Sequence, residues 1–200
     1  MIPERITGVV LAGGRSSRMG RDKAMLEWHG KPLILQAVGT LQQVCSKVII
    51  SAKQHEYAFT GCEIWPDELA VPAPITGIYS CLKRSSDERI MVLSCDMPLV
   101  TPALLAYLLE FDHAYDVIVP VHDNLCIEPL CGLYHRRILP LLEVALEAQQ
   151  YSLQQCIAST THKLVEILPD TPVFTPTLFL NINTPEDYPP DGVPPPRGGE

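Results

Sequence analysis

The chain has 200 residues, of which 46% are hydrophobic and 19% charged, so it is long enough and apolar enough to fold around a sizeable core. A formal net charge of -8 argues against a general nucleic-acid binder or a membrane-surface binder. Seven cysteines without a Cys-x-x-Cys pair, no secretory segment and no long apolar run predict a reduced, cytoplasmic protein without a membrane span.

The first predicted element is a short buried strand over residues 7–11 that leads directly into a glycine-rich basic loop. Four cationic side chains lie within nine residues, from Arg15 to Lys23, and the loop from residue 13 to residue 20 also holds three glycines and two serines. Glycines let backbone N–H groups approach an anion, and arginine binds phosphate through two parallel hydrogen bonds. In an acidic chain this local charge indicates a phosphate site. An ordinary strand-to-helix turn with solvated arginines is the alternative.

The rest of the chain predicts strands alternating with helices. Further strands are expected at residues 47–51, 63–65, 89–94, 117–120, 130–134 and 164–167, and residues 24–28 and 179–183 are expected to be extended. Helices are expected near residues 33–41, 76–82, 101–109, 136–149 and 153–158. This alternation predicts an α/β fold with a mostly parallel sheet covered by helices on both faces. Residues 1–187 form one predicted domain, and the Pro/Gly-rich residues 188–200 a disordered tail.

Ligands of such sheets bind beyond the carboxyl ends of the strands. The basic loop, Asp96 and the pair Asn181 and Asn183 all lie at or just past predicted strand ends. The loop is one residue too long for a P-loop and lacks its Lys-Ser/Thr, and it also lacks the Gly-x-Gly-x-x-Gly of dinucleotide-binding proteins. A third class of nucleotide loop is therefore required.

Residues 11–23, Leu-Ala-Gly-Gly-Arg-Ser-Ser-Arg-Met-Gly-Arg-Asp-Lys, resemble the signature of nucleotidyltransferases, most closely that of the molybdenum cofactor guanylyltransferases. Further blocks resemble that family in the same order, at residues 30–33, 73–78, 95–98, 128–130 and 181–187. The resemblance covers about residues 6–187. It implies a Rossmann-like nucleotidyltransferase fold and an enzyme that transfers GMP from GTP to the terminal phosphate of molybdopterin, releases pyrophosphate and uses Mg²⁺.

The resemblance also assigns roles to residues of this sequence. Nucleotide-contacting positions match Leu11, Ala12, Gly13, Gly14, Ser51 and Asp67, and triphosphate-lining positions match Gly14, Arg18 and Lys23. Asp96 matches the Mg²⁺ ligand, and Asn181 and Asn183 match a pair near the pterin and the reacting phosphates. Other proteins of cofactor synthesis and target molybdoenzymes are the partners that it implies.

The chemistry of these residues suits that reaction. Phosphoryl-type transfer needs positioning and charge neutralisation more than a protein nucleophile, so Arg18, Lys23 and Asp96 are the candidate catalytic residues. Alternatives are solvated surface cations at Arg18 and Lys23, a turn aspartate at Asp96 and an amide that only satisfies backbone groups at Asn181. At the level of function, the alternatives are a CTP-dependent cytidylyltransferase for the same cofactor and a non-catalytic module that binds nucleotide or molybdenum cofactor.

Overall fold

The computed structural model describes residues 5–12, 22–52, 55–69, 71–111, 114–123, 125–182 and residue 187. Most of the basic loop, residues 13–21, lies outside these ranges, as does the tail predicted over residues 188–200.

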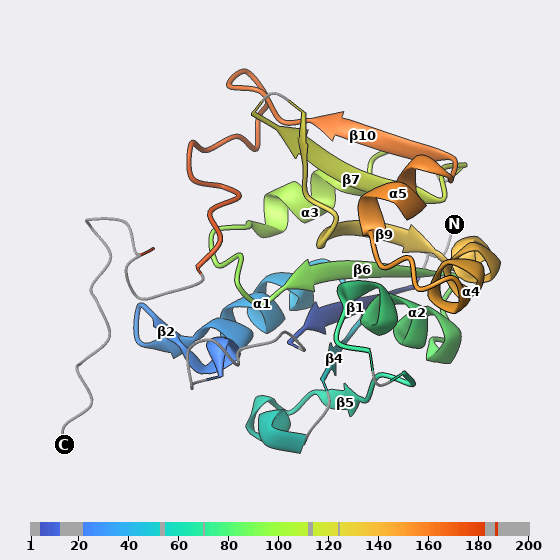
Figure 1. The fold of residues 1–200 in the computed structure, drawn as a ribbon. Coiled ribbons are helices and arrows are strands. Elements are labelled where there is room, and N and C mark those ends of the chain that lie inside the picture. The colour runs from blue at the N-terminus through green and yellow to red at the C-terminus, as the bar shows by residue number, and fades with distance from the viewer. Residues whose placement is uncertain are drawn as a thin grey trace.

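Eight strands of the described residues form one mixed sheet with the order β10-β7-β9-β6-β1-β4-β5, and β8 pairs with β7 (Figure 1). The strands are β1 Ile6–Leu11, β4 Lys47–Ser51, β5 Glu63–Trp65, β6 Arg89–Ser94, β7 Val117–His122, β8 Cys126–Ile127, β9 Cys131–His135 and β10 His162–Glu166. β1 is parallel to both β4 and β6, whereas β9 is antiparallel to β6 and β7. The predicted mostly parallel α/β sheet is confirmed.

Two groups of helices cover the sheet. The α-helices are α1 Leu33–Gln42, α2 Pro74–Arg84, α3 Pro102–Leu108, α4 Leu139–Glu147 and α5 Leu153–Ala158, and the 3-10 helices are η2 Lys23–Met25, η3 His55–Thr60 and η4 Arg136–Ile138. Apolar residues of α1 and α3 pack in one core cluster, and those of α2, α4 and α5 pack in a second. The sheet separates these clusters, so helices cover both of its faces, as predicted. Among the described residues, no helix combines the length and apolar character needed to cross a membrane.

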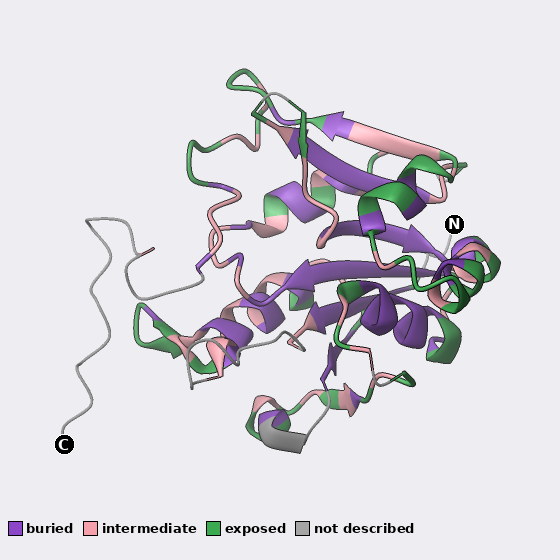
Figure 2. Cartoon of the chain, in the orientation of Figure 1, coloured by how far each residue is buried: buried purple, intermediate pink, exposed green. Residues whose placement is uncertain are grey.

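The central strands carry the apolar side chains that both helical layers need. Every residue of β6 is buried, as are the first five residues of β1 (Figure 2). Such a near-continuous apolar run is typical of a parallel strand that is covered on both faces. A smaller cluster of Trp28, Leu33 and Ile182 joins the two-stranded hairpin of β2 (Glu27–Trp28) and β3 (Lys31–Pro32) to the last described segment of the chain.

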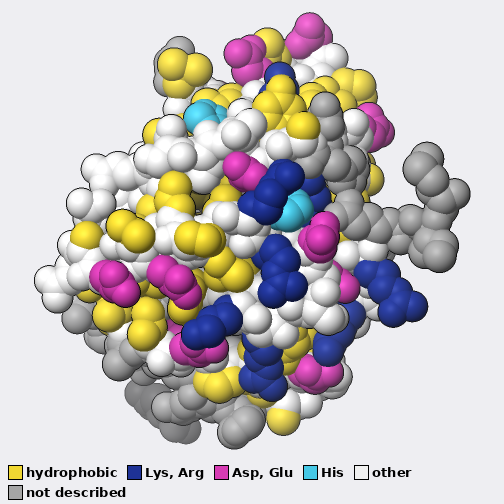
Figure 3. All heavy atoms as spheres, turned by 90° about the vertical axis from the view of Figure 1, so that its right-hand side faces the viewer, with side chains coloured by type: hydrophobic (Ala, Val, Ile, Leu, Met, Phe, Trp, Pro, Cys, Tyr) yellow, Lys and Arg dark blue, Asp and Glu magenta, His cyan; other side chains and the backbone are white. Residues whose placement is uncertain are grey.

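The edge of the sheet at which the parallel strands end differs from the edge at which they begin. At the carboxyl edge, Leu11 is in register with both Ser51 and Ser94, so β1, β4 and β6 end together. At the opposite edge, Lys and Arg side chains gather in a band down the face shown in Figure 3. Arg5, Lys47 and Arg84 line a cavity of about 510 Å³ there.

Three expectations from the sequence are wrong in detail. Residues 23–25 form the 3-10 helix η2 rather than extended backbone, because Asp22 caps it by accepting a hydrogen bond from the backbone N–H of Ala24. Residues 179–182 follow turns and form no strand within the described part of the chain. The single helix expected over residues 136–149 is η4 followed by α4.

Candidate active site

A pocket of about 140 Å³ opens at the carboxyl edge of the sheet, where β1, β4 and β6 end. It contains six of the residues that the sequence singles out: Leu11, Ala12, Lys23, Ser51, Asp67 and Asp96. Its other walls are Asp22, Ala24, Ala73, Pro74, Gly77, Ser94, Cys95 and Leu130. Segments from residue 11 to residue 130 thus meet in one place.

Backbone hydrogen bonds beyond the strand ends hold this edge together. The N–H of Ala12 donates to the carbonyl of Ser51 at 3.0 Å, and the N–H of Cys95 donates to the carbonyl of Leu11 at 3.3 Å. The start of the basic loop and the segment that carries Asp96 are therefore fixed to each other before any ligand binds.

Lys23 and Asp96 form an ion pair in the pocket, with 2.5 Å between Nζ and Oδ2. The neighbouring Asp22 helps to place Lys23, because its Oδ1 caps η2 and its Oδ2 accepts a hydrogen bond of 2.6 Å from the Tyr57 hydroxyl. A cation and a carboxylate from segments 73 residues apart thus share one site.

The second oxygen of Asp96 is the feature that points to a metal ion. Oδ1 is buried and has no hydrogen-bond partner among the described residues. An unsatisfied buried carboxylate oxygen is costly, whereas hard divalent cations prefer oxygen ligands such as carboxylates. The donor set therefore fits the divalent metal that nucleotidyltransferases typically use. The adjacent Cys95 does not compete for that role, because burial and the charge of Asp96 raise the pKa of its thiol to about 12.

Ser51 and Asp67 form a second polar pair in the lining of the pocket. The Ser51 hydroxyl donates to Asp67 Oδ1 at 2.8 Å. Helix α2 passes so close that a Cβ on Gly77 would lie 2.8 Å from Ser51 Oγ and 3.1 Å from Leu11 Cδ2. Glycine at position 77 is what lets the helix approach this pair. Ala73, the N-cap of α2, has a φ of -135°, so its backbone is extended and alanine fits there without strain.

Asn181 lies beside the pocket rather than in its wall. Its Nδ2 donates to the carbonyl of Phe179 at 3.2 Å, and the N–H of the following Ile182 donates to the carbonyl of Asp96 at 2.8 Å. The segment is thus tied to the Asp96 loop, while the amide of Asn181 bonds to nearby backbone.

The remaining candidates lie outside the described residues: Gly13, Gly14, Arg18 and Asn183. Conversely, the structure adds Asp22, Tyr57 and Gly77, which the sequence did not single out as site residues. The sequence offers a reason to select Gly77, since a glycine inside a predicted helix requires a packing reason. It offers none for Tyr57, because the contact of Tyr57 with Asp22 joins residues 35 positions apart.

Comparison with known proteins gives one consistent result. The family model described as the MobA-like NTP transferase domain matches residues 8–166. A protein of Pelotomaculum thermopropionicum, named a probable molybdenum cofactor guanylyltransferase, is 35% identical over 188 residues, which are 90% of this chain and 89% of that protein. The molybdenum cofactor guanylyltransferase of Pseudomonas entomophila is 35% identical over 153 residues, 74% of this chain and 80% of that protein.

The solved structures agree with this fold. A crystal structure from Aquifex aeolicus has a TM-score of 0.76 and 31% identity, and the match covers 90% of this chain and 94% of that one. Molybdopterin-guanine dinucleotide biosynthesis protein A from Archaeoglobus fulgidus has a TM-score of 0.77 over 91% of this chain and 94% of that one, at 24% identity. With the family model covering most of the sheet and the pocket, the chain belongs to the MobA-like NTP transferase family.

Proposed function

We propose that this protein transfers GMP from GTP to the terminal phosphate of molybdopterin, or of its molybdenum-loaded form, and releases pyrophosphate. The observation that carries the proposal is the pocket that is lined by both the Lys23–Asp96 pair and the Ser51–Asp67 pair. Relatives at about one-third identity bear the name of this activity. A nucleotide needs both kinds of group, because its phosphates require cations and its base and ribose require hydrogen-bond acceptors.

Lys23 and Arg18 are the proposed triphosphate clamp. In the described structure Lys23 pairs with Asp96, and the approach of a triphosphate offers its ammonium group a competing set of anionic oxygens. Leu11, Ala12, Gly13 and Gly14 complete the clamp as the backbone that leads out of β1. Positive charge there stabilises the pyrophosphate as it leaves.

Asp96 is the proposed ligand of Mg²⁺. Its buried Oδ1 provides the open oxygen, and Mg²⁺ typically binds one or two carboxylates together with phosphate oxygens. The bound ion supplies positive charge to the reacting phosphates. The incoming phosphate is already ionised at neutral pH, so no general base is required, and the chain's task is to orient and to neutralise.

Asp67 is the proposed partner of the nucleoside. The hydroxyl of Ser51 holds one of its oxygens, which leaves the other to accept hydrogen bonds from the base or the ribose. Asn181 and Asn183 are the proposed contacts of the pterin substrate, and the hydrogen bond from the N–H of Ile182 to the Asp96 carbonyl supports this by bringing Asn181 close to Asp96. A cytoplasmic location and contacts with molybdoenzymes remain predictions from the sequence.

Pyrophosphate release, measured with each of the four NTPs in the presence and absence of molybdopterin and Mg²⁺, tests the proposal. We expect release only with GTP, only with molybdopterin and only with a divalent metal. Release with CTP in place of GTP would assign the cytidylyl reaction instead. Nucleotide binding without turnover under all conditions would assign a non-catalytic module.

A further inference from the structure

A second cluster of metal-binding side chains lies on the β7–β8 hairpin. His122 ends β7, Cys126 begins β8, and Glu128 follows β8. One ligand atom from each side chain lies within 4.8 Å of the other two. Among the described residues, the walls of the Asp96 pocket include none of these three, so the cluster is a separate site.

The backbone holds these ligands in place without help from a metal. His122 is the direct cross-strand partner of Cys126 in the antiparallel β7–β8 pair. The N–H of Glu128 then donates to the carbonyl of Pro120 at 3.0 Å, which fixes the third residue to β7. One short hairpin thus presents three donors. The strand pairing already fixes the backbone that carries them, so a metal ion does not have to bring them together.

The surroundings of His122 favour a positive charge at this ring. Its Nδ1 lies 3.0 Å from Asp123 Oδ2, and its Nε2 lies 2.9 Å from Glu128 Oε1. A neutral imidazole donates from one nitrogen only, so both carboxylates are satisfied either by an imidazolium, which donates from both nitrogens, or by a cation bound at Nε2. With a cation at Nε2, Nδ1–H donates to Asp123 while Nε2 and Glu128 both bind the ion. Carboxylate–histidine–metal arrangements of this kind are common in proteins.

We propose that His122, Cys126 and Glu128 bind a Zn²⁺ ion. One nitrogen, one sulfur and one oxygen donor suit Zn²⁺, whereas Mg²⁺ prefers oxygen donors alone. Binding deprotonates the Cys126 thiol and releases the proton to solvent, so thiolate and carboxylate together balance the charge of the ion. Water fills the fourth position. Cys126 is exposed, the only one of the seven cysteines that is, and this gives the ion access from solvent.

The site has a structural consequence for the segment that carries Asn181. The His122 ring stacks on Phe179 with 4.4 Å between centroids, and the carbonyl of Phe179 accepts the hydrogen bond from Asn181. His122 also lines a cavity of about 370 Å³ with residues 174–180. An ion that fixes the imidazole therefore stabilises the position of this segment on β7.

Titration of the metal-free full-length protein with Co²⁺ tests the proposal, because cobalt adopts zinc-like geometry and its bond to thiolate gives a near-ultraviolet charge-transfer band. We expect the band to saturate at one equivalent and to disappear when Zn²⁺ is added. It should be unchanged by excess Mg²⁺ and by Asp96→Asn, which separates this site from the proposed catalytic metal.

Three variants locate the ligands. Cys126→Ser removes the band, and His122→Gln lowers cobalt affinity. Asp123→Asn, which removes only the outer hydrogen bond, lowers it by about 10–100-fold. Cys62→Ser is the matched control, since Cys62 is half-buried and retention of the band is expected. Absence of a charge-transfer band in the unmodified protein, or a band that survives Cys126→Ser, would overturn the proposal.

Discussion

Asp96 has two oxygens in different situations, and this difference decides what a substitution there does. Oδ2 pairs with Lys23, while Oδ1 is buried without a partner in the described residues. Asp96→Asn keeps the size of the side chain and removes the charge. We expect turnover to fall by about 100-fold or more, the effect of losing one preorganised electrostatic group. Steady-state pyrophosphate release measures it.

Asp87→Asn is the matched control for that variant. Asp87 accepts a 2.6 Å hydrogen bond from Thr7 at the opposite edge of the sheet, so its charge is remote from the pocket. Its turnover should equal that of the unmodified protein. Full turnover in Asp96→Asn would contradict the metal-ligand assignment.

Asp67 allows a test of nucleoside recognition at the level of single atoms. If Asp67 accepts from the guanine base, the enzyme prefers GTP over ITP, which lacks the 2-amino group. Asp67→Asn then reduces the preference for GTP over ITP by about tenfold, which corresponds to the loss of one hydrogen bond to a charged group. Competition between the two nucleotides measures the ratio.

Glu68→Gln is the control here, because Glu68 pairs with Lys83 on the surface of α2. If Asp67→Asn instead narrows the preference for GTP over 2′-deoxy-GTP and leaves ITP unaffected, the contact is to the ribose and not to the base.

At the scale of one element, α2 is positioned by the missing side chain of Gly77. A Cβ there would lie 2.8 Å from Ser51 Oγ, so Gly77→Ala must push the helix away or break the Ser51–Asp67 bond. Overpacking costs about 1–3 kcal/mol, whereas alanine in a helix gains only about 0.5–1 kcal/mol over glycine. We expect a net loss of stability in urea unfolding and weaker GTP binding.

Gly39→Ala separates these two effects. Gly39 lies within α1, and a Cβ there would meet nothing within 4 Å. This variant should gain stability by about 0.5–1 kcal/mol and bind GTP normally. Equal behaviour of the two alanine variants would show that close approach of α2 is not what position 77 requires.

Elements with strong local patterns were predictable from the sequence, and those fixed by distant contacts were not. The apolar residues 89–94 and the Thr101-Pro102 cap predicted β6 and the start of α3, where the Thr101 side chain accepts from the N–H of Leu104. β8 was missed because its two residues carry no periodicity and owe their strand conformation to pairing with β7. Leu180 and Ile182 look like part of a strand, but they pack with Trp28 of the β2–β3 hairpin and Leu33 of α1, and residues 179–182 pair with no strand among the described residues.

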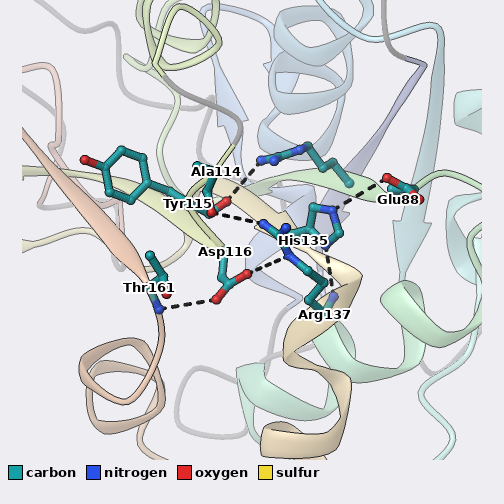
Figure 4. Close-up of polar contacts among 8 residues, drawn as sticks. Glu88, Ala114, Tyr115, Asp116, His135, Arg137 and Thr161 are labelled. Carbon is teal, nitrogen blue, oxygen red and sulfur yellow. Dashed lines mark hydrogen bonds and ion pairs between the residues drawn. The ribbon is translucent and has the colours of Figure 1, made fainter.

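At the scale of the whole molecule, a polar network closes the edge of the sheet opposite the pocket (Figure 4). His135 accepts from the N–H of Arg137 at 3.0 Å and lies 3.7 Å from Glu88, while Asp116 binds the Arg137 side chain and the N–H of Thr161. The network joins the ends of four strands: β6, β7, β9 and β10.

This network predicts a pH dependence of stability. Burial and the charges of Arg137 and Arg89 lower the pKa of His135 below its ordinary value of 6.5, despite the opposing charges of Glu88 and Asp116. The unfolded chain therefore takes up a proton at His135 more readily than the folded protein. The stability from the neutral imidazole is present above pH 6.5 and is lost as the pH falls toward the lowered pKa, at no more than about 1.4 kcal/mol per pH unit.

His135→Asn keeps a capping acceptor for Arg137 and cannot titrate. Urea unfolding between pH 7 and pH 5 should show a shallower loss of stability in this variant than in the unmodified protein. Identical slopes would assign the acid sensitivity to other groups.

The layered α/β architecture followed from alternating elements, but the direction of β9 did not. β9 runs antiparallel to both of its neighbours, β6 and β7. No local pattern in residues 131–135 predicts this pairing. Likewise, the sequence predicted that the basic loop and Asp96 lie at the same edge of the sheet, but it did not predict the direct ion pair of Lys23 and Asp96, with 2.5 Å between Nζ and Oδ2. Composition and periodicity do not predict which residues far apart in the sequence come into contact.

The central place of β1 has a consequence for how the protein is made. Its neighbours are β4, about 40 residues later, and β6, about 80 residues later, so a chain emerging from the ribosome carries β1 with an unpaired side until residue 94 is available. The unpaired edge of β1, a strand that carries the apolar side chains of Val9 and Val10, is a template for pairing with other chains. The same distant pairing also means that the Lys23–Asp96 pair cannot form earlier. Nucleotide-binding competence is therefore acquired only after the segment that carries Asp96 has been translated.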